Sequence, residues 1–168
     1  MSYFLFGSFD SKYKQLTQSI KSYGNKKNVY FYFNEEINFY KDILRMCDEQ
    51  NLRREMIFAM TSDNQPCNSS DLLFPYDKFT NEELFKDPTR NYFKKCCRDN
   101  IEILFDCLQR LMEIFCPKQI SIFVVEGYDT DFQKKKCTLM EMKQDLLRQI
   151  EANSFIDSCI YEILNESE

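Results

Sequence analysis

Short apolar runs alternate with segments of helical periodicity along most of this chain. Four runs are apolar or aromatic at almost every position and predict buried strands over residues 3–6, 29–33, 56–60 and 120–125. Between them, apolar residues recur every three or four positions, which predicts helices. These helices cover approximately residues 11–23, 35–47, 91–116 and 139–150. A mixed run at 155–164 predicts a last strand, although a helix is an alternative there.

The order of these elements is β-α-β-α-β-loop-α-β-α-β. Such alternation predicts a single α/β domain over residues 1–168, with a mostly parallel sheet of four to five strands and helices on both faces. The last strand can form an antiparallel edge. Residues 61–79 follow no regular pattern, and we interpret them as a solvated excursion, with a functional loop as the alternative. A capping box over residues 80–83 predicts a short helix, which Pro88 interrupts.

The first turn of the predicted fold follows Gly7, which we expect to end the first strand. Asp10 or Ser11 can then cap the next helix. Backbone N–H groups of this turn could instead hold an anion at the helix N-terminus, but an ordinary cap is favoured. A second capping box, Thr138 with Glu141, marks the start of the last helix.

The net charge of −5 resides in the last quarter of the chain. Residues 1–125 carry 17 basic and 17 acidic side chains, whereas residues 126–168 carry 5 and 10. Nucleic-acid binding normally needs a basic stripe, so no nucleic-acid partner is expected. The longest basic run, 134–136, is interpreted as a solvated helix entry. An acidic chain suits a basic partner or serves solubility alone.

Membrane and export signals are not evident in the sequence. No apolar stretch has the length of a membrane span, and the first seven residues lack a basic signal-peptide region, so we expect a cytoplasmic protein. Eight cysteines occur without C-x-x-C spacing. Since most of them fall in apolar patterns, we expect them to be reduced and buried as small hydrophobic residues.

Most common catalytic designs are excluded by composition. The chain has no histidine, which removes His-dependent triads and the usual zinc ligands. Its three glycines cannot build a glycine-rich phosphate loop. Cys96 and Cys97 stand among basic residues, but the apolar stripe of their helix favours a structural role. We therefore expect no enzyme activity and no cofactor.

Carboxylates follow each of the first four predicted strands. If the strands are parallel, their carboxyl ends meet at one edge of the sheet, where ligands of such sheets bind. Tyr128 and Phe132 would stand among the acids. The expected edge comprises Asp10, Glu35, Glu36, Asp63, Glu126, Tyr128, Asp129 and Asp131.

Three interpretations of this edge remain open. Helix N-termini attract carboxylates, so the acids can have a purely local role. Asp129 and Asp131 could belong to a Mg²⁺-dependent or nucleotide-binding enzyme, because hard oxygen ligands suit that ion. An acidic, aromatic surface can also dock a basic protein, with charge promoting association.

In overall character, the whole chain resembles the immunity proteins of bacterial contact-dependent growth inhibition and polymorphic toxin systems. It shares with them a small size, acidic charge, many Phe, Tyr, Asn and Lys residues, and no catalytic signature. The resemblance implies a non-catalytic protein that binds and neutralises one cognate toxin domain, often a basic nuclease. It assigns no functional residue. An oligomeric regulatory subunit is a further alternative.

Overall fold

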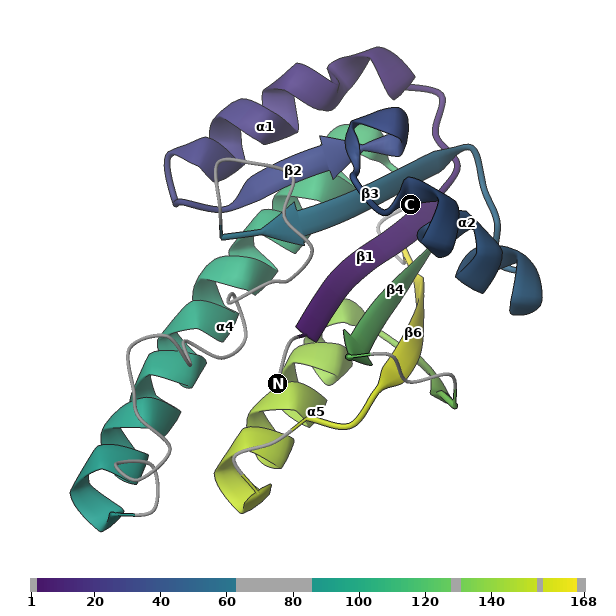
Figure 1. Ribbon diagram of the computed structural model, residues 1–168. Coiled ribbons are helices and arrows are strands. Elements are labelled where there is room, and N and C mark those ends of the chain that lie inside the picture. The colour runs from purple at the N-terminus through teal and green to yellow at the C-terminus, as the bar shows by residue number, and fades with distance from the viewer. Residues whose placement is uncertain (1–2, 63–85, 128–130, 154–155, 166–168) are drawn as a thin grey trace.

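A six-stranded mixed sheet organises the chain, which the computed structural model describes over residues 3–62, 86–127, 131–153 and 156–165 (Figure 1). The strand order is β2-β3-β1-β4-β6-β5. The N-terminal strand therefore lies inside the sheet. The strands are β1 (Tyr3–Phe9), β2 (Tyr30–Phe33), β3 (Met56–Thr61), β4 (Gln119–Glu126), β5 (Gln133–Cys137) and β6 (Cys159–Leu164).

The sheet is mostly antiparallel, so the predicted mostly parallel sheet of four to five strands is wrong. β1 runs antiparallel to both of its neighbours, β3 and β4, and only β5 and β6 are parallel. The error has a physical cause. Helices cover both faces, so the central strands are apolar on both sides, and that pattern is the same whichever way a strand runs.

Helices lie on both faces of the sheet, as the sequence predicts. One face carries α1 (Thr17–Asn25), α4 (Asp87–Phe115) and α5 (Leu139–Asn153), and α2 (Tyr40–Glu49) lies on the other (Figure 1). Two short 3₁₀ helices, η1 (Lys14–Leu16) and η2 (Asn34–Glu36), precede α1 and α2. Over the described ranges, no helix has both the length and the apolar character needed to cross a membrane.

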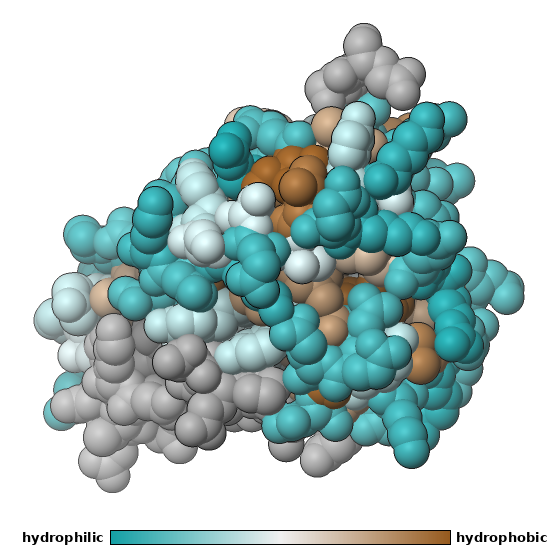
Figure 2. All heavy atoms as spheres, turned by 90° about the horizontal axis from the view of Figure 1, so that it is seen from above, coloured by the Kyte–Doolittle hydropathy of each residue, from teal (hydrophilic) through white to brown (hydrophobic). Residues whose placement is uncertain are grey.

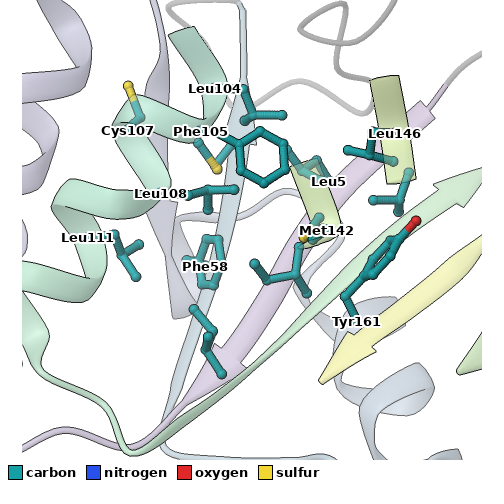
Figure 3. Close-up of a cluster of buried hydrophobic side chains, with 14 of the residues drawn as sticks. Leu5, Phe58, Leu104, Phe105, Cys107, Leu108, Leu111, Met142, Leu146 and Tyr161 are labelled. Atoms are coloured by element: carbon teal, nitrogen blue, oxygen red, sulfur yellow. The ribbon is translucent and has the colours of Figure 1, made fainter. Parts of the chain in front are cut away.

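The larger core lies between the sheet and the three helices α1, α4 and α5. Its α4 side consists of the predicted stripe, including Leu104, Leu108 and Leu111, all fully buried. In Figure 3 these side chains and Met142 of α5 lie close to Phe58, which projects from the sheet. The helical periodicity of residues 91–116 is thus confirmed, and α4 extends four residues further toward the N-terminus. Pro88 lies in its first turn, where a missing N–H costs nothing.

Gly7 lies in the middle of β1 and does not end the strand, contrary to the sequence-based expectation. A Cβ atom at this position would collide with the main-chain oxygen of Ser121 and the ring of Phe58. Glycine is therefore required for close packing across the sheet and has no role in a turn.

Neither residue expected to cap α1 does so. The helix is preceded by η1 and has no side-chain cap. Asp10 instead accepts a hydrogen bond from the backbone N–H of Glu55 at 2.9 Å. Ser11 donates to the carbonyl of Phe115 at 2.5 Å, which ties this turn to the end of α4. By contrast, Thr138 and Glu141 form the predicted capping box at the start of α5.

The run of lysines at 134–136 belongs to β5, an edge strand that the sequence analysis missed. It was interpreted as a helix entry because the segment lacks apolar residues. Lys134 and Lys136 are exposed, while Lys135 extends toward α5 and pairs with Asp145. Charged edge strands prevent edge-to-edge pairing between molecules, which explains a strand of this composition.

A buried carboxylate connects α5 to the last two strands. Asp145 is 7% exposed, and it accepts hydrogen bonds from Tyr161 at 2.7 Å, Lys135 at 2.8 Å and Gln149 at 3.2 Å. Arg148 also pairs with it. Burial alone would raise the pKa of Asp145. The hydrogen bonds from Lys135 and Tyr161, with the nearby positive charges, outweigh burial and lower that pKa. Burial raises the pKa of Tyr161, and its hydrogen bond to Asp145 raises that pKa further.

Candidate functional site at the β1 end of the sheet

The antiparallel sheet divides the predicted carboxylate edge between its two ends. Asp10 follows β1, and Glu35 and Glu36 lie in η2 directly after β2, which runs in the same direction. These three acids therefore share one end of the sheet, at which β1, β2, β5 and β6 finish and β3 and β4 begin. We call it the β1 end. Glu126 pairs with Tyr3 and lies at the opposite end. The prediction that all of these carboxylates share one edge of the sheet is therefore wrong.

The other members of the predicted edge are not brought to the β1 end. Asp131 is exposed and begins the segment that leads into β5. Phe132 is half-buried and packs edge-on against Phe123, with ring centroids 6.2 Å apart. Asp63, Tyr128 and Asp129 lie outside the described residues. Within the described parts of the chain, no three potential metal ligands converge.

Glu55 is a carboxylate at the β1 end that sequence reasoning missed. It immediately precedes β3, and β3 begins at this end because it runs against β1. Its backbone N–H binds Asp10, and its carbonyl accepts a hydrogen bond from the Asn34 side chain at 3.1 Å. A search of the residues before each strand would have found it, but only if the direction of β3 were known.

Cations neutralise part of this acidic group. Lys14 pairs with Glu55, and Lys21 pairs with Glu36 at 2.5 Å. Glu36 also accepts a hydrogen bond from the N–H of Phe33 at 3.1 Å, which fixes η2 after the strand. Among the described residues, the carboxylates of Asp10 and Glu35 make no ion pair, and both residues are exposed. The β1 end is thus a surface of mixed charge.

A broad, open depression of about 1120 Å³ lies at the β1 end. Exposed Tyr13 stands in it, with 45% of its surface accessible. Seen from the side on which α1 lies, the molecule is mainly hydrophilic, with hydrophobic side chains visible between polar ones (Figure 2). The lining joins η1 and the segment before it to the starts of β3 and β4. It comprises Asp10, Ser11, Lys12, Tyr13, Lys14, Gln15, Arg54, Glu55, Cys116, Lys118 and Gln119.

The cysteines behave as the sequence predicts at four of the seven described positions. Burial raises the pKa of Cys97 to about 12 and that of Cys47, Cys107 and Cys159 to about 11, so these four thiols stay protonated and unreactive. Cys96 and Cys137 are half-buried, and Cys116 departs furthest from the prediction. It is exposed at the left-handed C-terminus of α4, with φ of 46°, and it lines the depression.

We expect these thiols to differ in reactivity with a chromogenic disulfide reagent. Cys116 should react in the fastest phase in the native protein, because its sulfur is exposed. The four buried thiols should react only at the rate of unfolding. The variant Cys116→Ser should lose one thiol from the fastest phase, and guanidinium should release all eight thiols of the parent chain. A fast phase of unchanged amplitude in Cys116→Ser would contradict this assignment.

In comparisons with known proteins, no protein-family model, no curated protein and no solved structure matches the chain.

Proposed function

We propose that this chain is a non-catalytic binding protein that docks a partner protein at its β1 end. A cognate toxin domain is the partner that the resemblance to immunity proteins implies. The observation that carries the proposal is the broad depression, whose lining combines charges of both signs with the exposed ring of Tyr13. Tyrosine is enriched at protein interfaces because it buries a large apolar area and keeps a polar tip.

Two further observations support a binding role. The four buried cysteines have raised pKa values, so they do not supply thiolate nucleophiles. The Mg²⁺-dependent alternative placed its site on the single acidic edge expected of a parallel sheet. Glu126 and Asp131 are separated from Asp10 and Glu35 by the length of the strands, so the described acids form no common metal site.

A growth assay tests the function. A candidate toxin domain taken from a neighbouring gene is expressed in a test bacterium, with and without this chain. Growth inhibition that this chain relieves is the expected result, and a purified mixture should contain a complex by size exclusion with light scattering. Undiminished inhibition together with no complex would contradict the proposal.

Charge variants test the surface. Glu35→Arg should slow association with the toxin domain by about threefold to tenfold at low salt, because an exposed acid without an ion-pair partner is replaced by a cation. Asp131→Arg is the matched control, since Asp131 is also exposed but lies at the other end of the sheet. Stopped-flow association rates of the two variants should converge at high salt. If Asp131→Arg slows association and Glu35→Arg does not, docking occurs elsewhere.

A further inference from the structure

Arg54 holds an unusual position for a charged side chain. It is half-buried in the segment between α2 and β3, and its Nη1 donates to Ser121 Oγ at 3.0 Å and to the carbonyl of Ser8 at 3.4 Å. Both serines are fully buried and pair with each other across β1 and β4. Ser8 is fixed in turn by a 2.6 Å hydrogen bond to the carbonyl of Leu52. Within the described ranges, the guanidinium is therefore held in place by neutral groups.

The rest of this guanidinium has no partner among the described residues. Arginine has five N–H donors in a planar fork, and the contacts of Arg54 use only those on Nη1. No described carboxylate pairs with it. A rigid fork with free donors is the arrangement that binds carboxylate or phosphate through two parallel hydrogen bonds.

Two lysines add positive charge to the depression that Arg54 lines. Lys12 and Lys118 line the same depression and are exposed, and neither makes an ion pair with a described residue. The lining contains four cationic side chains and two carboxylates, so it carries two excess positive charges on a chain whose net charge is −5. Of the two carboxylates, Glu55 is paired with Lys14 and Asp10 accepts a hydrogen bond.

We infer that the depression is a binding site for a phosphate monoester, in which the Arg54 fork holds the phosphate oxygens and Lys12 and Lys118 balance its charge. A phosphate group of this kind carries a charge of about −1.5 to −2 near pH 7, which matches the excess of two, whereas a carboxylate would balance half of it. The depression has room for more than a phosphate group, since small-ligand sites span roughly 300–1000 Å³. Tyr13 offers an exposed ring to the remainder of the ligand.

Isothermal titration calorimetry of the chain alone tests this site with inorganic phosphate and with a nucleoside monophosphate. Arg54→Gln should weaken binding of both probes by at least about tenfold, because it removes the charged fork. Arg53→Gln is the matched control. Arg53 is exposed, pairs with Asp48 at 3.1 Å and lies outside the depression. The Arg53→Gln variant should therefore bind both probes as tightly as the parent protein.

A second variant keeps the inference falsifiable if Arg54→Gln unfolds the protein. Lys12 and Lys118 are exposed, so the double variant Lys12→Gln, Lys118→Gln should fold normally and weaken both probes by severalfold. Tighter binding of the monophosphate than of inorganic phosphate supports a ligand that also contacts the rest of the depression, and equal affinity supports a site for the phosphate group alone. No binding at millimolar phosphate, or equal losses in Arg53→Gln and Arg54→Gln, would overturn the inference.

The site does not depend on the toxin-binding proposal, and the two can fail separately. Phosphate binding is measured without a partner, and neutralisation is measured by growth. Arg54→Gln should weaken phosphate binding by the same factor of about tenfold or more whether or not the chain relieves toxicity. Glu35→Arg should leave phosphate affinity unchanged, because Glu35 does not line the depression.

Discussion

Replacing Gly7 with alanine is expected to lower the free energy of unfolding by about 3 kcal/mol. The added methyl group would meet the main-chain oxygen of Ser121 and the ring of Phe58, both in the centre of the sheet. The oxygen belongs to β4, which pairs with β1 along its whole length, so it cannot move without disturbing that ladder. Urea denaturation followed by circular dichroism measures the change.

Gly127→Ala is the control for this prediction. Gly127 has a φ of +55°, and nothing lies within 4 Å of a Cβ atom placed there. The substitution should therefore lower the free energy of unfolding by only about 1 kcal/mol, because alanine is disfavoured in the left-handed backbone conformation. Equal losses from the two substitutions would show that β1 and β4 are less closely packed than the structure indicates.

Asp145→Ala is expected to lower the free energy of unfolding by a similar amount, about 3 kcal/mol. The substitution leaves the buried hydroxyl of Tyr161 without its acceptor and removes the contact that holds Lys135 of β5 to α5. Because the lysine side chain is 38% exposed, solvent screening limits its share, and most of the loss comes from Tyr161. Thermal and chemical denaturation provide the measurement.

A double-mutant cycle with Tyr161→Phe isolates the shared hydrogen bond. The loss from Asp145→Ala should be smaller when Tyr161→Phe is already present, because no buried hydroxyl is then left unpaired. Asp157→Ala serves as a control, since Asp157 is exposed, and it should change the stability by less than about 0.5 kcal/mol. Strict additivity of Asp145→Ala and Tyr161→Phe would contradict the coupling.

The lowered pKa of Asp145 also sets the direction of a pH effect. A carboxyl group whose pKa is lower in the folded state than in the unfolded chain, where it is about 3.9, stabilises the fold above that value. That contribution is lost as the pH falls from about 4 through the folded-state pKa. Asp145→Asn should therefore flatten the decline in stability below pH 4. If Asp145→Asn loses stability below pH 4 as steeply as the parent protein, the pKa of Asp145 is not lowered by folding.

Local elements could be predicted here because their signals are local. The spacing of apolar residues in α4 and the box of Thr138 with Glu141 depend on neighbours in sequence, and both predictions are confirmed. β5 was missed because an edge strand of lysines lacks the apolar residues by which buried strands are recognised. Gly7 was misread because the backbone that excludes a side chain there lies more than a hundred residues away in sequence.

The candidate site could be predicted only in part, since it depends on strand direction. Asp10, Glu35 and Glu36 share an end because β1 and β2 are co-directional in either topology. Glu55 and Arg54 reach the same end because β3 reverses, and apolar composition carries no information on direction. The role of Arg54 further requires the buried pair Ser8 and Ser121, and the sequence pattern predicts a turn at Ser8 and a strand at Ser121, with nothing to connect them.

The interior position of the N-terminal strand has a consequence for how the chain is made. In the finished sheet Phe4 lies opposite Val125, and neither neighbour of β1 is adjacent to it in sequence. During synthesis the first strand therefore leaves the ribosome long before β4 exists to pair with it. Contacts between such distant segments carry a large loop-closure entropy and slow the folding of small domains. We expect the β4-facing side of β1 to stay unpaired in the nascent chain until Glu126 has emerged, a period in which chaperones would be needed.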